Sequence, residues 1–178
     1  YVEELAEKHK IGFINSLLVN KNTLDSFLQR KAKNPNYKFL GNSQNLDPKK
    51  IIMAGNLNKH WFAIMIDVSG EKPLVYCADA LNWHQHHPHF FECAERVLKL
   101  LDPKFVLEQE GRITLRVPDQ GNGVDCGPAC TVFLKLFAEN RLINNKDILA
   151  DLKEFDYSPQ RLVVANELLS SKARKLQN

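Results

Sequence analysis

The sequence predicts an α+β fold, with a central mixed β-sheet flanked by helices. One observation is a group of short apolar runs in the middle of the chain, which have the length and composition of buried strands. A second is a set of segments whose apolar residues recur at helical spacing. A third is the absence of any internal repeat or linker-like stretch, which predicts a single domain over residues 1–178.

The predicted elements follow in chain order. Residues 1–32 carry two short helical patterns, the second capped by Thr23, and the stretch up to Lys50 is rich in Asn, Pro and Gly and predicts a loop. A turn at Ser69-Gly70-Glu71-Lys72 joins two of the apolar runs into a hairpin. The predicted strands lie at 50–54, 60–67, 74–79, 105–108 and 113–117. The later predicted helices lie at 90–101, 126–139 and 158–173.

Composition excludes several functional classes. The 44% hydrophobic content of this 178-residue chain is enough for a substantial core. No apolar run approaches the roughly 20 residues needed to span a membrane. The net charge of +3 is small and evenly spread, which argues against nucleic-acid binding. The chain starts at Tyr1 without a Met and shows no secretory leader, so we expect an excised domain of a larger protein.

The four cysteines do not form a recognisable disulfide or zinc pattern. Cys77, Cys93 and Cys130 lie in apolar patterns and are expected in the core. The histidine-rich stretch 84–89 could bind zinc or copper, but it has no matching second group of ligands. We therefore expect an exposed loop there, with no metal and no cofactor.

Cys126 is placed to react. It follows the glycine-rich stretch 120–125 and opens an apolar helical pattern. The first amide groups of a helix have no internal partners and carry partial positive charge, so helix N-termini stabilise thiolates. This position predicts a nucleophilic cysteine.

A thiolate nucleophile needs a base and a group that orients the base. His60 begins one strand of the predicted hairpin and Asp79 ends the other. Since the start of one antiparallel strand lies beside the end of the next, the two side chains should meet. Asp79 would then orient His60, whose other ring nitrogen would face Cys126.

Two further features fit a nucleophilic site. Gln120 lies six residues before Cys126, and its side-chain amide could stabilise the oxyanion of a tetrahedral intermediate together with the backbone N–H of Cys126. The glycines at 121, 123 and 127 leave room for the backbone and a substrate to approach closely.

These residues form an ordered set, which in chain order is His60-Trp61, Asp79-Ala80-Leu81, Gln120 and Asp125-Cys126-Gly127. The set resembles the signature of the ubiquitin-like-protein-specific cysteine proteases, the superfamily of the SUMO proteases, the adenovirus protease and the deubiquitinase effectors of intracellular bacteria. The resemblance covers about residues 50–138. It implies a variant of the papain-like fold, with the nucleophile at a helix N-terminus.

Position by position, the resemblance implies Cys126 as nucleophile, His60 as base, Asp79 as orienting carboxylate and Gln120 as oxyanion donor. It implies that Trp61 roofs a narrow channel for a Gly-Gly tail, with Gly127 also in the substrate-binding site. Only glycines pass easily beneath an aromatic ring lying close to a backbone floor.

The resemblance also implies a function. We expect a monomeric cysteine isopeptidase that cleaves after the C-terminal Gly-Gly of ubiquitin or of a modifier such as SUMO or NEDD8. Residues 1–50 lack the Trp-Leu-(Asn/Asp)-Asp pattern typical of SUMO proteases, which favours ubiquitin. A reactive thiol requires a reducing intracellular compartment, which could be a host cytosol if the protein is a bacterial effector.

Two alternatives use the same residues. Some bacterial effectors of the same fold transfer an acetyl group through this cysteine, although Asp79 and the His60-Trp61 pair favour a protease. The second alternative is a binding module that has lost catalysis. It is disfavoured because all four catalytic positions carry the residues that catalysis needs.

Overall fold

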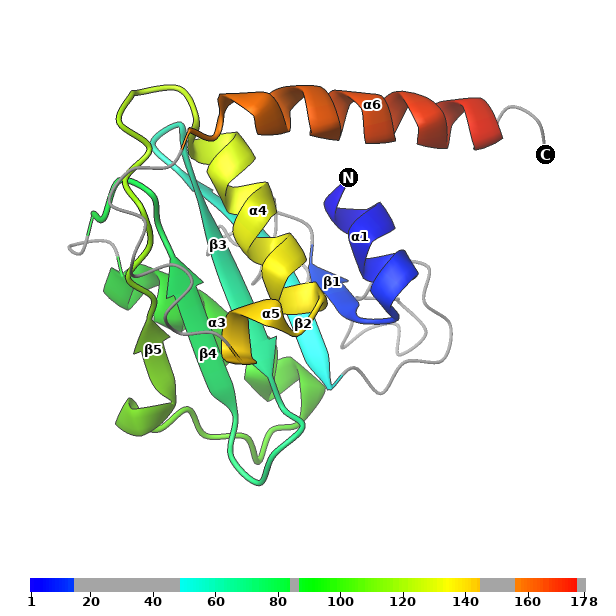
Figure 1. The fold of residues 1–178 in the computed structure, drawn as a ribbon. Helices are drawn as coiled ribbons and strands as arrows, with labels where there is room; N and C mark the ends of the chain where they lie inside the picture. The colour runs from blue at the N-terminus through cyan, green and yellow to red at the C-terminus, as the bar shows by residue number, and fades with distance from the viewer. Residues whose placement is uncertain (15–48, 84–86, 145–155, 176–178) are drawn as a thin grey trace.

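The computed structural model of the chain describes residues 1–14, 49–83, 87–144 and 156–175 (Figure 1). Its centre is a mixed sheet with the strand order β1-β2-β3-β4-β5. The strands are β1 (Gly12–Ile14), β2 (Lys50–Leu57), β3 (His60–Asp67), β4 (Leu74–Ala78) and β5 (Arg112–Thr114). The inner pairs β2–β3 and β3–β4 are antiparallel, whereas β1 and β5 run parallel to their neighbours.

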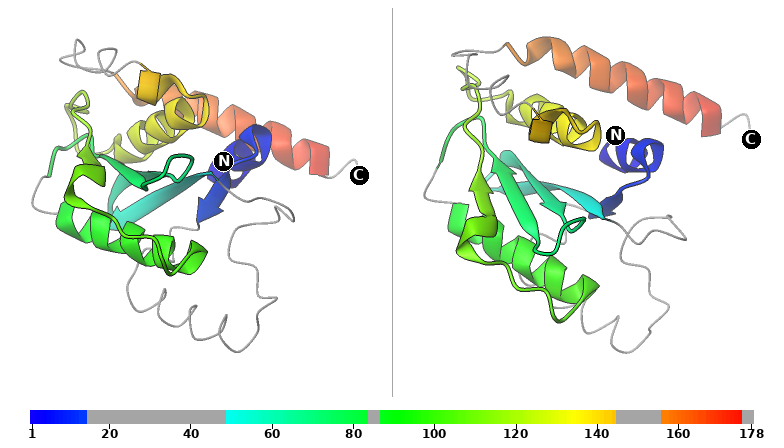
Figure 2. Two further views of the ribbon diagram at one scale, coloured as in Figure 1. Left: turned by 90° about the horizontal axis from the view of Figure 1, so that it is seen from below. Right: turned by 60° about the horizontal axis from the view of Figure 1, so that its bottom comes forward.

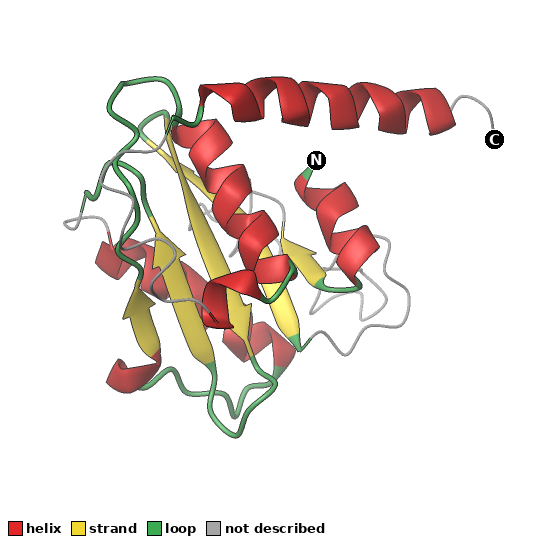
Figure 3. Cartoon of the chain, in the orientation of Figure 1, coloured by secondary structure: helices red, strands yellow, loops and turns green. Residues whose placement is uncertain are grey.

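Helices cover both faces of the sheet, which confirms the predicted α+β architecture (Figures 2 and 3). One face carries α3 (His87–Leu101). The opposite face carries α1 (Val2–His9), α4 (Cys126–Ala138) and α5 (Arg141–Asn144). The last helix, α6 (Ser158–Lys175), crosses near the start of α4, and a short 3₁₀ turn, η3 (Gln109–Gly111), precedes β5. None of the helices that the structure describes is both long enough and apolar enough to span a membrane.

A tight turn fixes where β3 begins. Leu57 pairs with His60, so only Asn58 and Lys59 connect β2 to β3. Both have positive φ, 53° and 67°, as a two-residue type I′ hairpin requires. The turn therefore sets the register of the hairpin and places His60 at the first position of β3.

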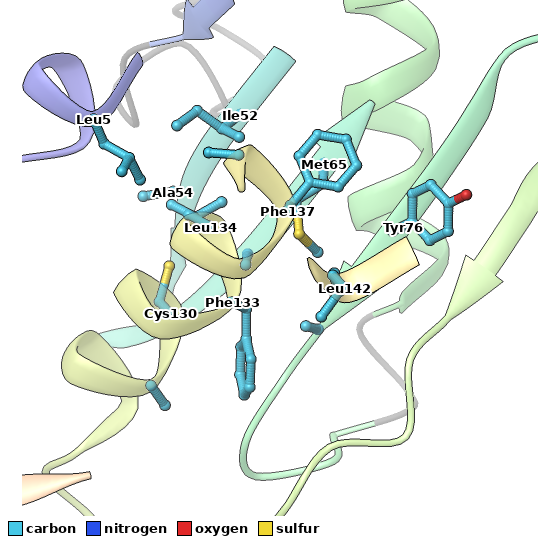
Figure 4. Close-up of a cluster of buried hydrophobic side chains, with 14 of the residues drawn as sticks. Leu5, Ile52, Ala54, Met65, Tyr76, Cys130, Phe133, Leu134, Phe137 and Leu142 are labelled. Carbon is cyan, nitrogen blue, oxygen red and sulfur yellow. The ribbon is translucent and has the colours of Figure 1, made fainter. Parts of the chain in front are cut away.

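The alternation of side chains along the strands divides the core into two clusters. Residues such as Met65 and Tyr76 point toward α4 and pack with Phe133 and Phe137 (Figure 4). Residues such as Ile64 and Cys77, which pair across β3 and β4, point toward α3. A sheet that is buried on both faces in this way holds its register firmly, because a slip by one residue would exchange the two faces.

Two predicted strands need correction, and one strand was not predicted. The predicted strand at 105–108 is wrong: this segment is irregular, and Val106 is 66% exposed, so its short apolar run does not pair in the sheet. In place of the strand predicted at 113–117 the structure has the shorter β5, which ends at Thr114. The sequence pattern also missed β1, whose three residues are too few for an alternation to be visible. The helix predicted after Thr23 and the loop predicted up to Lys50 lie almost entirely outside the described residues.

Candidate active site

His60 and Asp79 meet at one end of the β3–β4 hairpin. Ile64 pairs with Cys77. If the same register is extended toward the open end of the hairpin, away from the turn, Asp79 lies opposite Phe62. His60 and Asp79 are then diagonal neighbours on the same face of the sheet. His60 Nε2 lies 2.6 Å from Asp79 Oδ1, and the two residues are 4% and 2% exposed. The predicted contact between these residues is confirmed.

The Asp79 carboxylate is held by more than the imidazole. Its Oδ1 also accepts the backbone N–H of Leu81 at 2.9 Å, and its Oδ2 accepts that of Trp83 at 3.0 Å. Burial alone would raise the pKa of Asp79, but the hydrogen bonds from His60, Leu81 and Trp83 outweigh it and leave the pKa below its usual value. Asp79 is therefore an ionised acceptor at neutral pH.

The contact with Asp79 determines which nitrogen of His60 can act as a base. An ionised carboxylate only accepts hydrogen bonds, so Nε2 carries a proton, and in the neutral imidazole Nδ1 is the nitrogen that keeps its lone pair. Nδ1 is buried and has no hydrogen-bond partner among the described residues. Trp83, which the sequence analysis did not single out, packs against the imidazole with 4.7 Å between ring centroids. The ring contact and the hydrogen bond together restrict the orientation of His60.

Cys126 is the first residue of α4, as predicted. The first turns of this helix lie against the start of β3: the Cys130 thiol donates to the Phe62 carbonyl at 3.2 Å. A Cβ placed on Gly127 would lie 3.8 Å from the Trp61 ring. The helix and β3 begin at the same end of the molecule (Figure 1). Cys126 therefore lies at the end of the sheet that carries His60.

Gln120 lies in the loop that joins β5 to α4. Its backbone N–H donates to the carbonyl of Ala80 at 3.0 Å, which attaches the loop to the segment that follows Asp79. Its side-chain Nε2 donates to the carbonyl of Asn122 within the loop. A primary amide has two N–H groups, so one remains for a further acceptor. The buried Oε1 has no partner in the part of the chain that the structure describes.

Trp61 borders a cavity beside the candidate nucleophile. The Trp61 side chain points to the α4 face, opposite to His60, and the residue is 36% exposed. The cavity has a volume of about 440 Å³ and is mostly apolar. It lies between β2, β3 and the helices α1, α4 and α6, and is lined by Val2, Ala54, Trp61, Gly127, Pro128, Cys130, Thr131, Arg161, Val164 and Ala165. Trp61 and Gly127, the two residues predicted to bind the substrate, thus both line this cavity.

All four cysteines are buried, and Cys77, Cys93 and Cys130 belong to the core, as predicted. Burial raises the pKa of Cys93 to about 11 and raises the pKa of Cys77 and Cys130 well above the usual value of a thiol. These thiols are neutral near pH 7. The histidine-rich stretch lies partly outside the described residues, and among those described no group of three or more His, Cys, Asp or Glu is placed to hold a metal.

The comparisons identify the family. The sequence model of the Ulp1 protease family, C-terminal catalytic domain, matches residues 2–172, and the chain belongs to this family. A search of curated protein sequences returned no match. Membership confirms the resemblance that the four motifs indicated, whereas a place among bacterial effectors stays a prediction.

Solved structures share the fold. The SUMO protease Ulp1 with its catalytic cysteine oxidised to a sulfinic acid has a TM-score of 0.54 at 17% identity, over 78% of this chain and 64% of that chain. The Ulp1 protease domain in complex with Smt3, the yeast ortholog of SUMO, has a TM-score of 0.55 at 15% identity, over 89% and 68%. The ASFV pS273R protease has a TM-score of 0.50 at 12% identity, over 82% and 57%. The chain thus spans 57–68% of the length of these solved chains, and likeness at such identities concerns the fold.

The position of Cys126 predicts selective alkylation. Brief treatment of the native protein with iodoacetamide at neutral pH should modify Cys126, which at 8% is the most exposed of the four buried cysteines, before the three cysteines whose pKa is raised by burial. Peptide mapping by mass spectrometry measures the modified fraction at each cysteine, with urea-unfolded protein as the control in which all four react. Modification of Cys130 or Cys93 as fast as Cys126 would contradict the assignment of a reactive helix N-terminus.

The lowered pKa of Asp79 predicts a loss of stability in acid. A carboxyl group with a lower pKa in the folded than in the unfolded state stabilises the fold fully above its unfolded pKa of about 4, and this contribution is lost as the pH falls through the folded value. Asp79→Asn should therefore be less stable than the wild type at neutral pH, with a gap that narrows in acid. Urea unfolding over a pH series measures this gap, and a gap of constant size would refute the prediction.

Proposed function

We propose that the chain is a cysteine protease that cleaves after the C-terminal Gly-Gly of a ubiquitin-like modifier. The observation that carries the proposal is the buried hydrogen bond between His60 Nε2 and Asp79 Oδ1. It leaves Nδ1 as the basic nitrogen at the end of the sheet where α4 begins with Cys126. A nucleophile, a base and an orienting carboxylate define a thiol-hydrolase site by their geometry and not by their order in the chain.

In the first step, His60 Nδ1 takes the proton of the Cys126 thiol, and the thiolate attacks the carbonyl carbon of the last glycine. The imidazolium that forms is stabilised by the ionised Asp79, which keeps its own charge. The negative charge moves to the carbonyl oxygen. A second N–H of Gln120 Nε2 and the backbone N–H of Cys126 are the groups we assign to this oxyanion.

Collapse of the tetrahedral intermediate breaks the C–N bond. His60 gives its proton to the leaving amine, and the modifier stays attached to Cys126 as a thioester. Water then attacks the thioester with His60 again as base, which releases the modifier as a free carboxylate and restores the thiol. Removal of a single oxyanion donor typically costs about 10²–10³ in rate, so Gln120 is proposed as an essential part of the site.

Trp61 and Gly127 are proposed to limit the substrate to a glycine tail. The ring of Trp61 stands next to Gly127, so a chain that passes over the start of α4 has an aromatic surface on one side and backbone below. A substrate side chain at that point would collide with the ring, whereas glycine leaves the space open. This arrangement fits the Gly-Gly terminus that ubiquitin-like modifiers share.

Two observations favour different members of the modifier class. The first 50 residues lack the Trp-Leu-(Asn/Asp)-Asp pattern of SUMO proteases, which favours ubiquitin. Among the solved structures with this fold, one is a complex with the yeast ortholog of SUMO. The proposal therefore concerns ubiquitin-like modifiers as a class, and the experiment with modifier probes identifies the particular modifier. Because the proposed mechanism needs a free Cys126 thiol, we also propose that the protein acts in a reducing compartment.

The proposal predicts a covalent adduct with a modifier probe. Ubiquitin, SUMO and NEDD8 that carry a C-terminal electrophile are each incubated with the protein, and the intact mass is measured. We expect one class of probe to add its full mass to the wild type and not to Cys126→Ala. Cys93→Ala is the matched control, since it removes a buried thiol on the opposite face of the sheet and should still react.

The outcome separates the competing functions. An adduct that survives in Cys126→Ala would show that another residue is the nucleophile. If no probe reacts while acetyl-CoA acetylates Cys126, the acetyltransferase alternative replaces the protease. If a modifier binds without any adduct, the domain is a binding module.

A further inference from the structure

The residue just before Cys126 is held by a side chain from the C-terminal helix. Asp125 is 2% exposed. Its Oδ1 accepts a hydrogen bond from Arg161 Nε at 2.8 Å and lies 2.7 Å from Arg161 Nη2. Nη2 also donates to the backbone carbonyl of Val124. The guanidinium group thus holds two consecutive residues of the loop that leads into α4.

The second oxygen of Asp125 is bound from within the loop. Asn122 Nδ2 donates to Asp125 Oδ2 at 2.8 Å. The Oδ1 of the same Asn122 accepts the backbone N–H groups of Val124 and Asp125 at 2.9 and 3.0 Å. The hydrogen bond from Asn122 lowers the pKa of Asp125, burial opposes this, and Arg161 adds to the lowering, so the carboxylate is charged at neutral pH.

The start of α6 is itself anchored. Tyr157 precedes the helix and is 1% exposed, and its hydroxyl group donates to the carbonyl of Pro118 at 3.1 Å. Its ring packs edge-on against Phe133 of α4, with 6.0 Å between centroids. Arg161, in the first turn of α6, therefore extends from a support that is fixed to both the loop and α4.

We propose that Arg161 is a positioning residue that acts through Asp125 on the reactivity of Cys126. Asp125 is the N-cap residue of α4, and its carbonyl accepts the N–H of Ala129 at 2.9 Å. A displacement of Asp125 would move the thiol of Cys126 and its backbone N–H together. Misplacement of reacting groups by about 1 Å can cost about 100-fold in rate. The inference rests on the proposed function for its substrate, but not for the alkylation of the thiol.

Arg161 is suitable for mutagenesis because it can be replaced without creating a cavity in the core. Its side chain is about half exposed, and the contacts that matter come from the planar guanidinium group. Arg161→Gln removes the charge and the fork of donors. Arg161→Lys keeps the charge but not the fork, so it should recover only part of the function. Arg141→Gln is the matched control, because Arg141 is an exposed arginine just beyond the opposite end of α4 and pairs with Glu139.

The experiment measures four quantities for each variant: kcat and KM with the modifier substrate that the probes identify, the rate of Cys126 alkylation by iodoacetamide, and the thermal midpoint. For Arg161→Gln we expect kcat to fall by about 10- to 100-fold with KM within about threefold. The alkylation rate should fall by at least about threefold, because a displaced helix start would move the Cys126 thiol away from its proposed base, His60. Arg141→Gln should match the wild type in kcat and in the alkylation rate.

A double-mutant cycle isolates the contact. If Arg161 acts through Asp125, then Arg161→Gln should lower kcat and the alkylation rate only slightly in protein that already carries Asp125→Asn. Arg161→Lys keeps the comparison informative if Arg161→Gln does not fold.

Two results would overturn the proposal. One is a lower thermal midpoint with kcat and the alkylation rate unchanged, which would make the contact only structural. The other is a raised KM with unchanged kcat, which would mean that Arg161 touches the substrate. If the wild type cleaves no modifier, the proposed function fails, while the alkylation rates still decide the role of Arg161.

Discussion

The candidate site depends on one constraint, the register of the β2–β3–β4 meander. The two-residue turn at Asn58-Lys59 starts β3 at His60, and the pairing of β3 with β4 brings Asp79 diagonally opposite. Because side chains alternate between the two faces, a shift of one residue would send His60 toward α4 and separate it from Asp79. The packed cores on both faces of the sheet resist such a shift, so the stability of the fold and the geometry of the site have the same cause.

The remaining parts are attached to this hairpin by hydrogen bonds. Asp79 is bound by the backbone of the residues that follow it, and Ala80 accepts the N–H of Gln120. Gln120 and Asn122 shape the loop, and Asn122 in turn holds Asp125 at the start of α4. Residues that are far apart in the sequence are thus joined by a chain of hydrogen bonds that leads from the base to the candidate nucleophile.

Much of this arrangement could be predicted from the sequence. His60 and Asp79 were predictable because a hairpin of strong apolar strands converts sequence spacing directly into spatial proximity. Cys126 was predictable because a glycine-rich loop followed by a helical pattern marks a helix start. The strand predicted at 105–108 is absent, because a short apolar run says nothing about whether a neighbouring strand has a free edge, and Val106 is exposed to solvent.

Contacts between segments that are far apart in the chain could not be predicted from the sequence. Arg161 lies 36 residues after Asp125, and the two meet because the start of α6 packs beside the start of α4. Trp83 was likewise missed, since its contact with the imidazole depends on how the chain turns after Asp79. In both cases the residue type is ordinary at its position, and its role follows from tertiary packing alone.

The most direct test of the central claim is the tautomer of His60. The side-chain nitrogens of the histidines can be observed by ¹⁵N NMR in Cys126→Ala protein at mildly alkaline pH, with a His60→Gln variant to assign the signals. The account predicts a neutral imidazole with its proton on Nε2, bound to Asp79, and a bare Nδ1. A proton on Nδ1 would contradict the account, because the nitrogen assigned to accept the thiol proton would then have no lone pair to do so.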